Sequence, residues 1–421
     1  MRVLSIFICI LCVFASENAR AQQLDPLAPT PDWRRVEVFQ ETMTREEFVQ
    51  LLDTVYAPGR AAAGMIEVKE NEAVIFKTLN PAETMTLRFA KDATSAKRAK
   101  TYWRVAMKLG AAKTKKPLAG LKLTLDAGHI GGAWGLMEER SFARPGDKPV
   151  QEGDMTLLVT KHVAEQAGAL GAEVTMVRSK SAPTSSFTVD ALRPQARKEL
   201  ELLGVTDVRE NYAGPRDPLK AQTVQWQAEK LFYRVAEIRE RARRVNEKFK
   251  PDAVVCIHFN ADDWSDPTAP VFTQRNDLHV LVHGCYSAGE LRFDDQRCEM
   301  LVKLLNRSHA EELAAAGPMA EALAKATSLP PFTYTTANAV RVGTNEAVWA
   351  RNLLANRLYE CPVIFLEPYR MNHEEVYARV QAGDYEGERE VAGKIRRSIF
   401  REYADAVVAG LRDYYAAARK K

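Results

Sequence analysis

The sequence predicts an α/β fold with a mainly parallel sheet flanked by helices, preceded by a small α+β N-terminal module. From Leu121 onward, apolar runs typical of buried strands alternate with helical stretches, the order expected of parallel strands with helical connections. Before Leu121, a short helical stretch precedes three short runs with strand character. The chain has 421 residues, 46% of them hydrophobic and 27% charged, and this composition excludes a disordered or fibrous protein.

Residues 1–21 have the pattern of a cleavable secretory signal. Arg2 precedes an apolar run over 3–15, and Ala19-Arg20-Ala21 matches the A-x-A cleavage pattern. The run is too short to span a bilayer comfortably, and no later stretch approaches the ~18 apolar residues of a membrane helix. We therefore expect an exported protein, periplasmic or extracellular, with no membrane span in its mature form. A retained N-terminal anchor is the alternative.

The next three segments are a tether, a small module and a linker. Residues 22–32 are rich in Pro and Gln and are predicted to form the tether. The module spans 33–108 and begins with a capping box at Thr44 and Glu47 that opens a helix. Its strands are predicted at 65–68, 73–76 and 85–89. Residues 109–120 form a Lys-, Ala- and Gly-containing stretch that we expect to be an exposed basic linker.

Residues 121–421 are predicted to form the catalytic α/β domain. Strands are expected at 121–126, 172–177, 252–259, 278–282 and 362–366, and helices at 153–166, 224–249, 294–327 and 388–415. The polar stretch 179–222 is predicted to be an insertion. In such sheets the functional residues gather at the carboxyl ends of the strands.

Charge and cysteine content restrict the function further. Lys and Arg number 59 against 55 Asp and Glu, a net charge of +4, which disfavours a dedicated nucleic-acid-binding protein. Cys9 and Cys12 lie in the segment predicted to be removed. The four remaining cysteines are too few for a disulfide scaffold. Cys285 and Cys298 could pair, and the sequence leaves this open.

Three predicted strands end in polar residues that do not suit a core. They end as Asp126-Ala127-Gly128-His129, as Ile257-His258-Phe259-Asn260 and as Leu366-Glu367-Pro368. Two imidazoles and a carboxylate at one edge of a sheet form a known catalytic zinc ligand set, and a second carboxylate can serve as the base for water. The strand ends therefore point to a zinc hydrolase.

These stretches resemble the signature segments of zinc-dependent N-acetylmuramoyl-L-alanine amidases. The similar segments follow the order of that family over about 118–421 and comprise residues 125–132, 152–154, 177–178, 240–246, 257–261 and 362–367, followed by Asn372. Family members usually have Asp-Pro-Gly-His-Gly-Gly in the first segment, where this chain has Ala127 and Ile130. The interval from His129 to Glu152 is also longer than usual, so Glu138 and Glu139 are alternative ligands to Glu152.

The resemblance implies a specific reaction and specific residues. The family hydrolyses the amide between the lactyl group of N-acetylmuramic acid and L-alanine of the peptidoglycan stem peptide. Its Zn²⁺ ligands correspond to His129, Glu152 and His258, and its catalytic glutamate corresponds to Glu367. We expect apolar surroundings to raise the pKa of Glu367. Asn260 and Arg241 are predicted to contact the substrate, and Arg241 could alternatively support the site.

Several alternatives stay open at this point. A different zinc peptidase acting on stem peptides, or an inactive wall-binding or activator protein, would share much of this pattern. Some relatives carry a helix that covers the zinc until an activating partner removes it, and 311–325 is the segment that could do so, although a surface helix is the simpler interpretation. His279 and His283 lie on one face of a predicted strand and could line the site, but their alternation alone predicts a solvated face.

Overall fold

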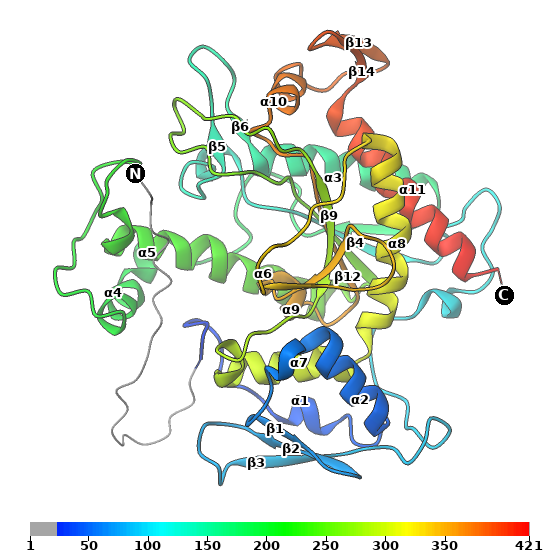
Figure 1. The fold of residues 1–421 in the computed structure, drawn as a ribbon. Helices are drawn as coiled ribbons and strands as arrows, with labels where there is room; N and C mark the ends of the chain where they lie inside the picture. Colours follow the sequence, from blue (N-terminus) through cyan, green and yellow to red (C-terminus); the bar gives the residue numbers. More distant parts are fainter. Residues whose placement is uncertain (1–22, 421) are drawn as a thin grey trace.

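The computed structural model describes residues 23–420, so the predicted signal segment lies outside the described residues. Its centre is a seven-stranded sheet with the order β10-β11-β9-β12-β8-β4-β7 (Figure 1). Its strands are β4 (Lys122–Ala127), β7 (Glu173–Met176), β8 (Ala253–Ile257), β9 (Leu278–His283), β10 (Ala339–Arg341), β11 (Val348–Arg351) and β12 (Val363–Pro368). Four strand pairs are parallel, and β9–β12 and β10–β11 are antiparallel, which confirms the predicted fold class.

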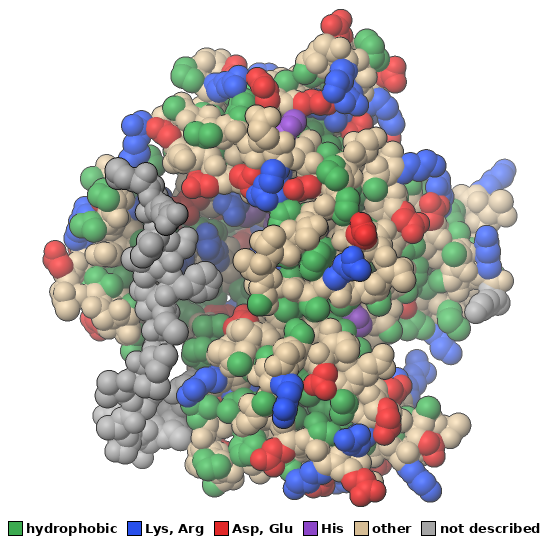
Figure 2. All heavy atoms as spheres, viewed as in Figure 1, with side chains coloured by type: hydrophobic (Ala, Val, Ile, Leu, Met, Phe, Trp, Pro, Cys, Tyr) green, Lys and Arg blue, Asp and Glu red, His purple; other side chains and the backbone are tan. Residues whose placement is uncertain are grey.

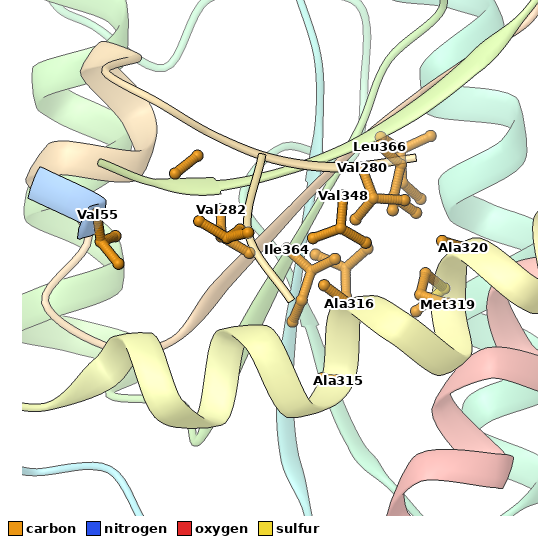
Figure 3. Close-up of a cluster of buried hydrophobic side chains, with 14 of the residues drawn as sticks. Val55, Val280, Val282, Ala315, Ala316, Met319, Ala320, Val348, Ile364 and Leu366 are labelled. Carbon is orange, nitrogen blue, oxygen red and sulfur yellow. The ribbon is translucent and has the colours of Figure 1, made fainter. Parts of the chain in front are cut away.

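Both faces of the sheet are covered by helices, because the central strands are apolar on both sides. In β8 every residue is buried; Val255 and Ile257 pack into one hydrophobic cluster, and Val254 and Cys256 into another. The first cluster includes α3 (Glu152–Ala169), α8 (Ser308–Thr327) and α11 (Ile399–Ala418), and Figure 3 shows side chains of α8 against those of the sheet. The second includes the end of α6 (Glu237–Arg243) and α9 (Leu354–Leu358).

An arm extends from the sheet where the insertion was predicted. The insertion contains α4 (Arg193–Leu202), which packs against α5 (Val224–Lys230). The helix predicted over 224–249 is present as α5 and α6 with π-helical turns at Leu231–Ala236 and Arg244–Phe249. In Figure 1 this arm projects to the left of the sheet.

The N-terminal module packs on the sheet domain through a continuous core. It consists of α1 (Arg34–Glu37), α2 (Arg45–Leu51) and an antiparallel sheet of β1 (Ile66–Val68), β2 (Glu72–Phe76) and β3 (Thr84–Arg88). The capping box of Thr44 and Glu47 is present. α1 and α2 pack on α7 (Asp294–Leu305), and residues of both parts belong to one hydrophobic cluster. Backbone N–H groups of Leu24 and Asp25 donate to Asp295, so part of the predicted tether lies against α7.

The chain end differs from the predicted helix 388–415. Residues 388–397 form a hairpin of β13 (Glu388–Val391) and β14 (Lys394–Arg397), and α11 begins only at Ile399. The two-residue turn has positive φ at Ala392 and Gly393, the geometry that suits a hairpin and interrupts a helix. The remaining elements are α10 (Glu374–Gln381) and a small hairpin of β5 (Ser141–Phe142) and β6 (Val150–Gln151).

Three other predictions can be compared with the structure. The stretch predicted as a linker has exposed lysines, but Arg419 donates hydrogen bonds to carbonyls from Leu109 to Ala119 and fixes its path. Cys285 and Cys298 are buried free thiols, so the disulfide left open by the sequence is not formed. Within residues 23–420, no helix is both long and apolar enough to cross a membrane.

A buried ion pair between Lys303 and Glu312 joins α7 and α8. Lys303 Nζ lies 2.8 Å from Glu312 Oε1, and the two side chains are 1% and 0% exposed. Lys303 also donates to the carbonyls of Tyr359 and Cys361, just before β12. Because neither charge reaches water, each depends on the other.

We expect Lys303→Met to lower the free energy of unfolding by about 3–5 kcal/mol, because it leaves the Glu312 carboxylate buried without its cation. Combining it with Glu312→Leu should recover much of this loss. Arg243→Met is the matched control, because Arg243 forms exposed ion pairs with Glu240 and Glu247, and should cost at most about 1 kcal/mol. Chemical denaturation measures all three, and a K303M loss as small as that of the control would contradict the expectation.

Candidate metal centre

Three adjacent parallel strands deliver the predicted residues to one edge of the sheet. β12, β8 and β4 are neighbours and run in the same direction. His129 follows β4, His258 follows β8, and Glu367 is near the end of β12. Ala127 and Leu366 both pair with Ile257, so the three strands end at the same level. The predicted convergence at the carboxyl ends is therefore observed.

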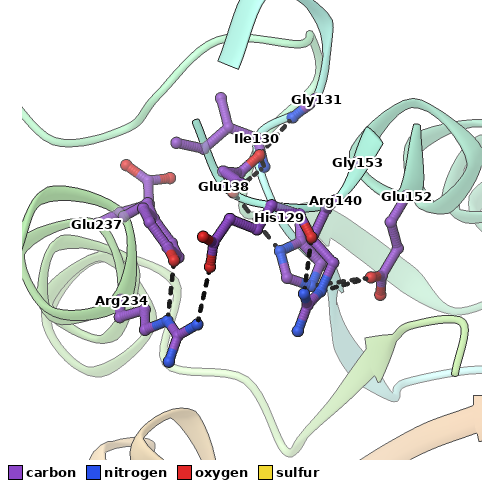
Figure 4. A network of polar contacts seen from close by, with 12 residues as sticks. His129, Ile130, Gly131, Glu138, Arg140, Glu152, Gly153, Arg234 and Glu237 are labelled. Carbon is purple, nitrogen blue, oxygen red and sulfur yellow. Dashed lines mark hydrogen bonds and ion pairs between the residues drawn. The ribbon is translucent and has the colours of Figure 1, made fainter. Parts of the chain in front are cut away.

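His129, Glu152 and His258 form a compact cluster. One ligand atom from each lies within 4.8 Å of the other two. His129 Nε2 is 3.1 Å from Glu152 Oε2, and His258 Nδ1 is 3.1 Å from Glu152 Oε1. Glu152 is the first residue of α3 and its side chain is 2% exposed. Figure 4 shows His129 and Arg140 beside Glu152, and Arg140 Nε lies 3.3 Å from its Oε2.

The structure distinguishes Glu152 from the two alternative ligands. Glu138 Oε1 lies 3.6 Å from Nδ1 of His129, the ring nitrogen that faces away from Glu152. Glu138 also accepts hydrogen bonds from the backbone N–H groups of Ile130 and Gly131 (Figure 4). This is how a carboxylate orients a ligating histidine. Glu139 instead pairs with Lys220 and accepts a hydrogen bond from the indole N–H of Trp226.

Glycines allow the ligand segments to approach one another. A Cβ on Gly128 would lie 2.3 Å from Cε1 of the His258 ring, and a Cβ on Gly153 would lie 2.2 Å from the backbone nitrogen of Gly131. Side chains at these positions would separate the two histidines or move α3 away from the loop. His129 itself has φ of 57°, a left-handed conformation that is strained for a residue with a side chain.

The buried side chain of Arg178 holds the strained loop in place. Arg178 donates to the carbonyl groups of Ala127, Gly128 and Gly153. Burial lowers the pKa of Arg178 to about 10, and the charge of Arg241 lowers it too, so it remains a cation at neutral pH. Together these bonds tie the strand end, the loop and the first turn of α3 to a single guanidinium.

Arg241 requires a correction. It was predicted to contact substrate, but it is 4% exposed, and its Nη2 donates to the His129 carbonyl at 2.7 Å. Its other donors bind Asp126 and Glu237. Burial lowers the pKa of Arg241, but the two carboxylates together raise it by more than burial lowers it. The net pKa of Arg241 is therefore above the ordinary value. Arg241 is therefore a positioning residue.

Glu367 has a partner that the sequence analysis did not identify. His279 Nε2 lies 2.7 Å from Glu367 Oε2, and the two residues are cross-strand neighbours because β9 is antiparallel to β12. His279 is 2% exposed, and His283 is also buried, so the solvated face predicted from alternation was wrong. Burial raises the pKa of Glu367, but the hydrogen bond with His279 lowers it, and the net pKa is below the ordinary value. The expected increase is therefore reversed.

A cavity of about 840 Å³ opens over the cluster. Figure 2 shows a hollow between the arm of α4 and α5 and the main body of the molecule. Its walls carry His129, Glu152, Glu367 and the predicted substrate residue Asn260, and the arm contributes Tyr212 and Lys220. α8, which contains the segment considered as a covering helix, packs on the sheet and contributes none of the described lining residues. The cluster is therefore open to a ligand from the cavity.

The donor set fits a zinc ion. Two imidazoles and one carboxylate are a known catalytic set for Zn²⁺, which leaves a position for water or substrate. Glu138, the second partner of His129, fixes the orientation of that imidazole. The ring of Phe365 stacks on the His258 ring, with 4.2 Å between the ring centres, and fixes the other imidazole. The arrangement is compatible with a metal site, with Glu367 in the same cavity.

Comparison of the sequence with protein-family models and with curated proteins found no match. Among solved structures, the chain is similar to N-acetylmuramoyl-L-alanine amidases. Ami1 from Mycobacterium smegmatis is 17% identical, with 71% of this chain and 99% of that chain covered and a TM-score of 0.36. CwlD from Clostridioides difficile, solved in complex with the GerS lipoprotein, is 13% identical, with 70% and 99% covered and a TM-score of 0.38. AmiC2 of Nostoc punctiforme is 16% identical, with 70% and 96% covered and a TM-score of 0.35.

We expect Gly128→Ala to weaken zinc binding by roughly 10- to 100-fold, because the added methyl group displaces the His258 ring from the cluster. Gly168→Ala in α3 is the matched control, since nothing lies within 4 Å of its added Cβ. Competition with a chromophoric zinc chelator measures both affinities. Equal affinities in the two variants would show that the His258 ring does not contribute to the site.

Proposed function

We propose that this chain is a zinc-dependent peptidoglycan amidase that hydrolyses the bond between N-acetylmuramic acid and L-alanine of the stem peptide. The observation that carries the proposal is the meeting of His129, Glu152 and His258 within 4.8 Å, with Glu367 lining the same cavity. The signature segments named above supply the choice of substrate. The cavity is large enough for a sugar and the first residues of a peptide.

The chemistry divides between the ion and the residues of the chain. When bound by His129, Glu152 and His258, zinc supplies Lewis acidity for the scissile carbonyl and for a water molecule. His279 engages Oε2 of Glu367, which leaves Oε1 to take the proton of the attacking water. Glu367 then delivers this proton to the nitrogen of L-alanine as the amide bond breaks. Asn260 Oδ1 accepts from the Ala261 backbone, so its amide N–H groups are left to bind substrate.

The location and partners follow from the same proposal. A peptidoglycan hydrolase acts outside the cytoplasm, in agreement with the predicted signal at 1–21. Whether the setting is periplasmic or extracellular depends on the cell envelope. An activating protein partner stays a prediction. Peptidoglycan is the proposed substrate, and we expect no nucleic-acid partner.

We expect the zinc-loaded protein to release intact stem peptides from purified peptidoglycan, detected by mass spectrometry. Glu367→Gln should lower the rate by about 10²–10⁴-fold, because the amide cannot take the proton, while zinc content stays unchanged. Shortened stem peptides would instead identify a peptidase. Absence of any product, with zinc bound and wild-type and E367Q indistinguishable, would favour an inactive wall-binding protein.

We expect His279→Leu to move the acidic limb of the kcat/KM profile to higher pH. Glu367 acts as a base in its ionised form, so activity is lost as the pH falls through its pKa. Without His279 the effect of burial dominates, the pKa of Glu367 rises, and the loss begins at a higher pH. His279→Gln, which can place an N–H near the same point, should restore part of the profile. Coincident profiles for the wild type and H279L would rule out this role for His279.

A further inference from the structure

The cavity is wider than the reacting bond requires, and its walls differ in charge. Three Lys or Arg side chains line it: Arg140, Lys220 and Arg351. Arg140 Nε lies 3.3 Å from Glu152, and Lys220 Nζ lies 3.0 Å from Glu139. Arg351 forms no ion pair with any residue in the described part of the chain. It is therefore the one of the three whose charge is not already matched by a carboxylate.

Arg351 is held in place although it has no acidic partner. It ends β11, is partly buried, and its Nη1 donates to the Tyr334 hydroxyl at 3.3 Å. Its guanidinium also lies 5.5 Å from the centre of the Tyr334 ring, which packs on Trp349. A side chain fixed in this way loses little conformational freedom when a ligand binds. Its remaining N–H groups form no bonds to described residues.

Arg351 is connected to Glu367 through the side chains of Tyr334 and His279. The Tyr334 hydroxyl that holds it lies 3.4 Å from Nε2 of His279, which in turn binds Glu367. Burial raises the pKa of Tyr334 to about 12, so this hydroxyl stays neutral. Arg351 and Glu367 thus line one cavity and share one chain of polar contacts.

We propose that Arg351 binds a carboxylate of the substrate's stem peptide, beyond the reacting amide, and so makes the enzyme selective for anionic stem peptides. The inference rests on the proposed function, which supplies a peptide with free carboxylates. A guanidinium presents a planar fork of donors that matches a carboxylate. The other walls already carry Glu139, Glu152 and Glu367, so a single negative charge is accommodated better than a doubly charged phosphate group.

The test compares two substrates that differ only in charge: N-acetylmuramoyl-L-Ala-D-Glu and the same compound with both glutamate carboxylates converted to amides. We expect the wild-type zinc enzyme to prefer the acid by roughly 10- to 100-fold in kcat/KM, the size of a charged hydrogen-bonded contact. Arg351→Gln should reduce this preference to near unity, because kcat/KM for the acid falls much more than kcat/KM for the diamide. Arg351→Lys, which keeps the charge without the fork, should retain part of the preference.

The control is Arg341→Gln in β10, a matched change at an exposed arginine outside the cavity, and it should keep the wild-type preference. A wild-type enzyme without preference, or R351Q with the wild-type ratio, overturns the inference and leaves the amidase proposal intact. An equal loss on both substrates in R351Q assigns Arg351 a structural role and also overturns it. If the zinc-loaded wild type cleaves neither compound nor peptidoglycan, the proposed function fails and the inference fails with it.

Discussion

The site depends on one close backbone contact, between the loop after β4 and the first turn of α3. Gly131 and Gly153 approach so closely that neither could carry a side chain in place. The loop presents His129 and the helix begins with Glu152, so this contact alone sets two of the three candidate ligands side by side. The third, His258, enters through the space left by Gly128. Rigid backbone thus does what flexible side chains could do only at a cost in entropy.

The strained backbone at this contact is stabilised by two buried guanidinium groups. A left-handed His129 and a tight loop are strained, and Arg178 and Arg241 offset the strain by donating hydrogen bonds to the buried carbonyls of Gly128 and His129. Burying two guanidiniums is itself unfavourable. Arg241 is compensated by Asp126 and Glu237, whereas Arg178 relies on carbonyls, and burial lowers its pKa to about 10. The loop of His129 and the first turn of α3 are therefore supported by buried side chains of Arg178 and Arg241.

The sequence could predict which residues meet at the edge of the sheet, but not which side chains are buried behind them. His129, His258 and Glu367 were recognisable because parallel strands end on one side, and each residue follows or ends an apolar run. His279 was named as a residue that could line the site, but its contact with Glu367 was missed because β9 runs against β12, which brings the start of a strand, not its end, to the same edge. Arg241 was assigned to the substrate because a motif gives a residue's place on a helix and not the side that is buried. The hairpin 388–397 escaped because an Ala-Gly turn is a weak signal within a charged stretch.

The partner of Glu367 also bears on how the site works as a whole. A base with a lowered pKa is ionised over a wide range of pH but is a weak acceptor of protons. In the proposed reaction such a base suffices if the water it deprotonates is acidified, as a divalent cation held by two imidazoles and a carboxylate would do. The His279–Glu367 hydrogen bond and the His129–Glu152–His258 cluster are thus two parts of one arrangement, because each is chemically useful in the presence of the other.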